Sequence, residues 1–159
     1  MEQDKGNVLR FSRWRISSDM KLLLLKTDHP KQQRHSSFGS YWIHDIEGKK
    51  TWLMTPPSQP PITAYAIWSP TGQSIAYVAN NDIYVIPSAT TASESPIRVT
   101  SNGNASLFNG VPDRVHEEEV FSSDFALWWS PDSTKVAFLH LDETLLRSIR
   151  TRSIILPKT

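Results

Sequence analysis

Short runs of alternating apolar and polar residues, separated by turn-forming residues, extend along most of the chain. Runs of four to seven residues bounded by Gly, Pro, Asn and Ser are typical of β-strands. The first eight runs are 10–16, 21–27, 40–46, 50–54, 63–68, 74–79, 83–86 and 97–100. Two more follow at 125–129 and 135–141. The pattern therefore predicts an all-β fold.

One turn sequence recurs along the chain. Residues 67–78 read IWSPTGQSIAYV and residues 128–139 read WWSPDSTKVAFL, while residues 16–25, ISSDMKLLLL, form a shorter copy. Aligned on their serines, the copies are 52 and 61 residues apart. A repeat of about 40–60 residues made of short strands is the signature of a β-propeller. The sequence thus predicts a partial propeller of about two and a half four-stranded blades.

A β-sandwich of about ten strands is the alternative, because short alternating strands suit that fold as well. The sandwich has no reason to repeat one turn at the spacing of a blade. We therefore favour the propeller.

Bulk composition excludes several classes of protein. A chain of 159 residues is long enough for one domain with a sizeable core. Its formal net charge of +1 gives no reason to expect nucleic acid as a partner. It contains no cysteine, so neither disulfides nor thiolate metal sites are expected. No P-loop, dinucleotide fingerprint or zinc cluster occurs, and we expect no cofactor and no metal.

The candidate chemistry lies in residues 109–121, NGVPDRVHEEEVF, which precede the apolar segment ALWWSP. Three consecutive carboxylates, Glu117, Glu118 and Glu119, stand between a turn-rich loop and a strand. An acidic run in a loop is ordinarily a solvated surface. Where flanking aromatic residues and prolines order the loop, two neighbouring carboxylates repel each other and need a cation between them. The free amino terminus of a peptide is one such cation.

Several motifs together resemble the N-terminal β-propeller of the dipeptidyl peptidase IV family, most nearly that of the fungal membrane-bound dipeptidyl aminopeptidases. The motifs are Asn109–Phe121, Ala126–Pro131, Asn80–Val85, Arg34-His35-Ser36 and Asp142-Glu143-Thr144. The similarity extends from about Val8 to Thr144, which is most of the chain.

The resemblance implies specific roles. In that family an eight-bladed propeller caps an α/β-hydrolase domain, and the enzyme removes dipeptides from peptides with proline or alanine in second position. The resemblance assigns to Glu118 and Glu119 the binding of the substrate's protonated amino terminus. It assigns to Arg34 the binding of a substrate carbonyl and the support of the glutamate pair. Glu117 is expected to be a support of the site or a charge at a helix end, and not a ligand-binding group.

The chain departs from the family near both halves of this site. The family commonly has tryptophan and tyrosine where this chain has Arg114 and His116, and tryptophan where it has Gln33. These lost aromatic residues put the rigidity of the site in doubt. Arg114 is expected to pair with the glutamates and to compete with the substrate.

No catalytic residue is predicted. The nucleophile turn of α/β-hydrolases, G-x-S-x-G, does not occur, and Gly72–Ala76 lacks its second glycine. We therefore expect the chain to be inactive alone, as the front part of a serine exopeptidase. The alternatives are a non-catalytic propeller module that binds peptides or a partner protein, and a fragment that dimerises with a full-length homologous propeller.

We expect residues 1–144 to form the partial propeller domain and residues 145–159 to be a divergent basic tail. That tail carries four basic side chains and no acidic ones. A shifted reading frame or an altered splice junction is the favoured origin, and a short amphipathic surface helix is the alternative.

The sequence carries no secretory signal and no run of about 20 apolar residues that would cross a membrane. The resemblance implies a vacuolar or cell-surface membrane, on its lumenal side. Asn104-Ala105-Ser106 is an N-glycosylation sequon, and Asn104 is the predicted acceptor.

Overall fold

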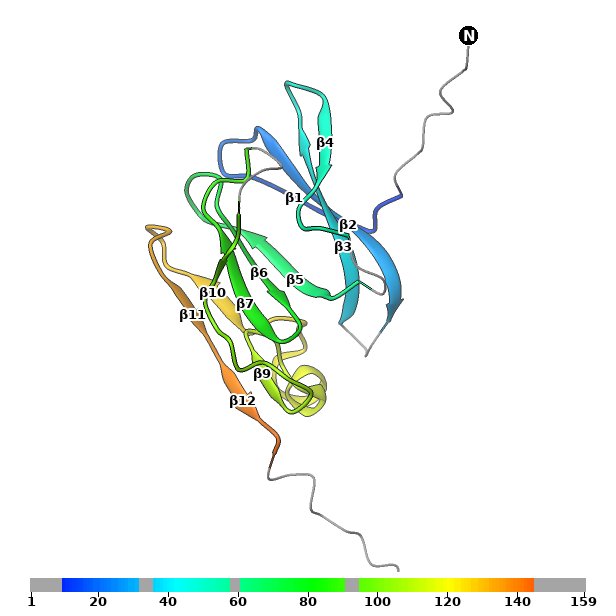
Figure 1. Ribbon diagram of the computed structural model, residues 1–159, viewed down its shortest axis with the longest axis vertical. Helices are drawn as coiled ribbons and strands as arrows, with labels where there is room; N and C mark the ends of the chain where they lie inside the picture. Colours follow the sequence, from blue (N-terminus) through cyan, green and yellow to red (C-terminus); the bar gives the residue numbers. More distant parts are fainter. Residues whose placement is uncertain (1–9, 32–35, 58–60, 91–94, 145–159) are drawn as a thin grey trace, which may run out of the picture.

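The computed structural model describes residues 10–31, 36–57, 61–90 and 95–144 (Figure 1). Arg34 and the basic tail, 145–159, lie outside the described residues. The described part of the chain forms twelve β-strands and one short helix, η1. The strands lie in three groups that follow one another in chain order (Figure 1).

The first two groups are four-stranded antiparallel meanders, each with the form of a propeller blade. The first contains β1 (Arg13–Ile16), β2 (Leu22–Lys31), β3 (Ser37–Asp45) and β4 (Lys50–Leu53). The second contains β5 (Thr63–Trp68), β6 (Ile75–Ala79), β7 (Asp82–Ile86) and β8 (Ile97–Arg98). These eight strands confirm both predicted blades, with shifts of a few residues at their ends.

A single backbone bridge between Gly39 of β3 and Thr63 of β5 joins the two blades. A Cβ atom at Gly39 would lie 2.7 Å from the carbonyl oxygen of Thr27 and 2.8 Å from Cε of Lys26. Glycine therefore allows β3 to lie close against β2 of its own blade at this point.

The third group is a half blade with an unexpected partner. β10 (Leu127–Trp129) pairs with β11 (Val136–Phe138), whereas β12 (His140–Asp142) pairs with β9 (Leu107–Asn109). The predicted run 135–141 is therefore wrong as one strand, because it changes partner at Leu139. β9 was not predicted, since three residues are too few to show an alternating pattern.

The three copies of the repeated turn share one geometry, which confirms the repeat. The serine N–H donates to the carbonyl oxygen five residues later in each copy, at 2.8–2.9 Å, from Ser17, Ser69 and Ser130. The fourth residue has a positive φ in each: 58° at Met20, 73° at Gly72 and 58° at Ser133. A blade repeat explains this coincidence and a sandwich does not, so the partial propeller is the correct fold class.

β6 provides residues to two hydrophobic cores because its side chains alternate between the two faces of the blade. Ile75, Tyr77 and Ala79 belong to the core that the first blade shares with the second. Ala76 and Val78 belong to the core between the second blade and the β10–β11 sheet. All five residues of β6 are buried, so the second blade is the packed centre of the described structure.

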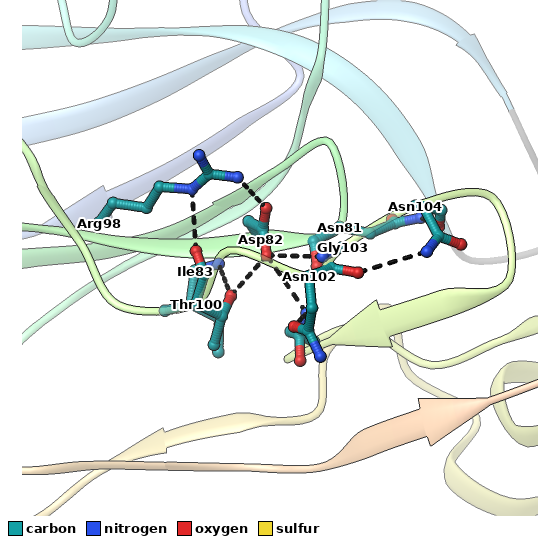
Figure 2. Close-up of polar contacts among 9 residues, drawn as sticks. Asn81, Asp82, Ile83, Arg98, Thr100, Asn102, Gly103 and Asn104 are labelled. Carbon is teal, nitrogen blue, oxygen red and sulfur yellow. Dashed lines mark hydrogen bonds and ion pairs between the residues drawn. The ribbon is translucent and has the colours of Figure 1, made fainter.

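A buried carboxylate, Asp82, joins β7 to the segment that leads into β9 (Figure 2). Arg98 Nη2 donates to its Oδ2 at 2.6 Å, and Thr100 Oγ1 and the Gly103 N–H donate to its Oδ1 at 2.8 and 2.9 Å. Asn109 Nδ2 approaches the same Oδ1 at 3.3 Å. Burial alone would raise the pKa of Asp82, but these hydrogen bonds outweigh it and hold the pKa below its ordinary value.

Asn109, at the end of β9, extends this network towards the candidate site. Its side chain is fully buried, donates to the Asn81 carbonyl oxygen at 2.9 Å, and contacts His140 Nδ1 through Oδ1 at 2.8 Å. Gly110 follows with φ of 74°, where an added Cβ would lie 3.1 Å from Ile83. The chain therefore leaves β9 at a fixed point, four residues before Asp113.

Candidate functional site

The three consecutive glutamates lie on η1 (His116–Phe121), a short π-helical segment shown in yellow in Figure 1. Asp113 holds its start: Oδ1 accepts the His116 N–H at 2.8 Å, as an N-terminal capping side chain does. Its Oδ2 lies 2.6 Å from His116 Nδ1, and its carbonyl oxygen accepts the Glu117 N–H at 2.9 Å. Ser122 ends the segment with φ of 47°.

The helix was not predicted from the pattern, and neither was the role of Asp113. The signal was present, because aspartate is a preferred N-cap residue and three glutamates follow it in the first turn of η1.

Glu117 points inward and is 1% exposed. Its Oε1 accepts the backbone N–H of Ser36 at 2.8 Å. Ser36 is the last residue of the Arg34-His35-Ser36 motif, so one hydrogen bond fixes the end of that motif beside η1. Arg34 itself lies outside the described residues, and its predicted contact stays a prediction.

Glu118 and Glu119 keep spare acceptor capacity. The side chain of Glu118 is 31% exposed, and its described ion-pair partner is Arg114, with Nε 3.9 Å from Oε1. Glu119 is exposed, and its side chain makes no hydrogen bond or ion pair within the described ranges. The two predicted ligand-binding carboxylates are thus accessible on the helix that also carries the buried Glu117.

A cavity of about 100 Å³ lies beside η1 and between the strand groups. Its walls come from the start of β3, the β6–β7 turn, the segment after β9 and the residues after η1. The cavity is lined in part by Ser36, Asn81, Glu117 and Asp124. The cavity is therefore lined by the buried Glu117 and by a second carboxylate, which the sequence analysis did not identify.

Asp124 is that second carboxylate. Arg13 Nη1 forms an ion pair with Asp124 Oδ2 at 2.8 Å, across 111 residues of sequence. The neighbouring Phe125 stacks on Tyr65 at 5.0 Å between ring centroids. These contacts fix the C-terminal end of the glutamate segment against the first and second blades. No local pattern indicates a pairing over such a separation.

Basic side chains also gather beside Asp124. Arg15 donates to the Tyr65 hydroxyl at 2.7 Å, and Lys26 Nζ, which is buried, donates to the Ser37 carbonyl oxygen at 2.6 Å. Burial raises the pKa of Tyr65, and the Arg15 hydrogen bond offsets part of that rise. Burial also raises the pKa of Tyr41, whose ring faces Lys26. Both phenols therefore stay protonated at neutral pH and stabilise the cations through hydrogen bonding or the ring face.

The predicted acceptor Asn104 lies on an exposed turn before β9. The described part of the chain holds no cluster of three or more potential metal-ligating side chains. Within the same residues, no helix has the length and apolar character needed to cross a membrane.

Comparison with known proteins identifies the family. Residues 17–159 match the family described as Dipeptidyl peptidase IV (DPP IV) N-terminal region. Over 131 residues the chain is 42% identical to the probable dipeptidyl-aminopeptidase B of Tuber melanosporum, which covers 80% of this chain. Over 128 residues it is 45% identical to the dipeptidyl peptidase 4 of Trichophyton tonsurans, which covers 79% of it.

The similarity extends to a solved structure, but it covers only a small part of each relative. The crystal structure of Porphyromonas gingivalis dipeptidyl peptidase 4 matches 88% of this chain with a TM-score of 0.76 and 26% sequence identity. The chain spans only 14% and 16% of the two fungal relatives and 19% of the crystallised one.

Proposed function

This chain belongs to the family of the dipeptidyl peptidase IV N-terminal region, and we propose that it binds the free amino terminus of a peptide substrate for a dipeptide-removing serine exopeptidase. Glu118 and Glu119 are the binding groups, and Arg34 supports them. The names of the relatives support the activity, and the arrangement of the three glutamates supports the site.

The chemistry of the ligand fits these two side chains. A protonated amino terminus offers three N–H donors, and Glu118 and Glu119 offer four carboxylate oxygens, of which one has a distant partner in Arg114. Hydrogen bonds between charged groups contribute about 1.5–3 kcal/mol each before desolvation. An acetylated terminus loses the charge and two of its donors, so it is the natural control ligand.

The single observation that carries the proposal is the hydrogen bond between Glu117 and Ser36. It joins η1 to the segment that ends two residues after Arg34, although 81 residues separate the partners in sequence. One glutamate of the three is therefore used to assemble the site, and the other two are left for a ligand. This division agrees with the roles that the resemblance implies.

Binding the terminus at a fixed place makes the chain a positioning element. If the amino nitrogen is held by Glu118 and Glu119, here called the clamp, the peptide bond after the second residue of the substrate lies at a constant distance from these two carboxylates. The bond-breaking groups then belong to an α/β-hydrolase domain, as the resemblance implies. The contribution of this chain is orientation and the choice of a two-residue product.

The test is a binding titration of the full chain with a peptide whose second residue is proline. We expect the free-amine peptide to bind and its N-acetylated form to bind at least tenfold more weakly. Glu118→Gln and Glu119→Gln should each weaken the free-amine peptide about tenfold or more. Both variants should leave the free energy of unfolding unchanged, because neither side chain is buried.

Glu47→Gln is the matched control, since Glu47 is an exposed glutamate on the β3–β4 turn, remote from η1 in sequence and outside the cavity. Equal binding of the free and acetylated peptides, or no binding at all, would overturn the proposal. Turnover of a chromogenic X-Pro dipeptide by the purified chain would contradict both non-catalytic alternatives, because neither of them cleaves peptides.

A further inference from the structure

We propose that Asn104 accepts an N-linked oligosaccharide when the chain is synthesised into the secretory pathway, and that the transfer precedes the pairing of β9 with β12. The inference does not depend on the proposed peptide site. It depends on the geometry of the turn that contains the sequon Asn104-Ala105-Ser106.

The turn presents the side-chain nitrogen of Asn104 to solvent. Asn104 is exposed, and its Oδ1 accepts the N–H groups of Ser106 and Leu107 at 2.8 and 3.2 Å. The Nδ2 atom has one long contact, 3.4 Å, with the Asn102 carbonyl oxygen. The hydrogen-bonded oxygen therefore orients the amide, and an oligosaccharide attached to Nδ2 would extend away from the fold.

The same turn buries Ser106, the third residue of the sequon. Ser106 is 7% exposed, and its carbonyl oxygen accepts the Glu143 N–H at 2.8 Å. Leu107, the next residue, pairs with Asp142 of β12. The sequon is defined by the hydroxyl residue as well as the asparagine, so an enzyme must contact both. Once β12 is in place, Ser106 is no longer available to it.

This contrast sets the order of events. β12 lies about thirty-five residues after the sequon, so the sequon leaves the ribosome before its pairing partner does. The folded turn tolerates the product because only Nδ2 changes. The modification is therefore compatible with the fold but inaccessible to an enzyme after folding.

The transfer needs an oligosaccharide donor linked to a lipid through pyrophosphate. Asn104 Nδ2 forms a bond to the anomeric carbon of the first sugar while the bond from that carbon to the phosphate oxygen breaks. The lipid pyrophosphate leaves with the bonding electron pair, and the nitrogen gives one proton to a base of the transferase. No oxidant or reductant takes part.

Cell-free translation of the full chain behind a cleavable secretion leader, with microsomes, tests the acceptor. We expect the protease-protected chain to show one mobility shift that an endoglycosidase removes. Asn104→Gln and Ser106→Ala should abolish the shift, and Asn102→Gln, a neighbouring asparagine outside any sequon, should keep it. A protected chain without the shift would overturn the proposal whether or not the chain folds.

A second measurement tests the order of events. The purified, unmodified full chain is incubated with solubilised transferase and lipid-linked donor, alongside a peptide of residues 100–110. We expect modification of the peptide and at least tenfold slower modification of the chain. Equal rates would overturn the claim that β9–β12 pairing makes the sequon inaccessible to the transferase. The assignment of Asn104 as the acceptor is tested by the translation experiment alone.

Discussion

Two sets of carboxylates, Asp82 at the β7–β9 junction and Glu118 with Glu119 on η1, have opposite surroundings. Asp82 is buried and receives hydrogen bonds from a guanidinium, a hydroxyl and a backbone N–H (Figure 2). Glu118 has one described partner at 3.9 Å, and the Glu119 side chain has none among the described residues. A carboxylate whose acceptors are filled stabilises the fold, and one with free acceptors can bind a ligand.

Glu117 stands between these two cases. It is as buried as Asp82 but lies in the same acidic run as Glu118 and Glu119. Charge alone therefore does not separate structural from ligand-binding carboxylates in this chain. Burial, together with the hydrogen bonds that each carboxylate accepts, does separate them, and substitutions at these positions test that distinction.

The largest effect is expected from Asp82→Asn. The amide keeps the shape but loses the charge, and its NH₂ group opposes one of the donors from Arg98, Thr100 or Gly103. Breaking a buried, hydrogen-bonded charge pair from one side should lower the free energy of unfolding by about 3 kcal/mol. Urea denaturation of the full chain measures it.

Asp132→Asn is the control for that experiment, because Asp132 is an exposed aspartate in the β10–β11 turn. We expect a clearly smaller shift of its denaturation midpoint. If Asp82→Asn is as stable as the parent chain, the contrast between saturated and open carboxylates is wrong.

An intermediate effect is expected from Glu117→Ala. The substitution removes the acceptor for the Ser36 N–H and should cost about 2 kcal/mol of folding free energy. It should also weaken peptide binding, because Ser36, two residues after Arg34, loses its hydrogen bond to η1. Glu117→Gln keeps a carbonyl oxygen for the Ser36 N–H and should restore part of both quantities.

The pair of Glu117 variants separates structure from binding. If Glu117→Gln restores stability but not peptide affinity, the charge of Glu117 takes part in binding, and its assignment as a supporting residue is wrong. If neither variant changes stability, the Glu117–Ser36 hydrogen bond does not hold the site together.

The sequence predicted those features that depend on neighbouring residues. The repeated turn and the two blades follow from patterns within a few residues, and the structure contains both. β6 was predicted for the same reason. The side chains of β6 alternate between two hydrophobic cores because the strand lies between two sheets. The sequence pattern shows only that the strand is apolar.

The sequence did not predict the contacts that assemble the site. Glu117 meets Ser36 across 81 residues, and Arg13 meets Asp124 across 111. β9 has three residues and exists because β12 pairs with it. Such contacts are set by how the blades stack. A single sequence does not show which distant residues will contact each other.

The smallest effect is expected from Arg114→Gln. Arg114 is 76% exposed and lies 3.9 Å from Glu118, so it acts as a weak built-in cation at the proposed clamp. Exposed ion pairs of this kind contribute about 0.2–1 kcal/mol. Removing the guanidinium should therefore strengthen binding of the free-amine peptide about two- to fivefold.

The direction of this change makes it informative. A misfolded variant loses affinity, so a gain cannot result from damage to the fold. Arg114→Lys should behave as the parent chain because it keeps the cation, and Lys135→Gln should too, because it removes an equal charge from the exposed β10–β11 turn. If all three variants bind the peptide as the parent does, Arg114 does not compete at Glu118, and the open carboxylates are independent of their neighbour.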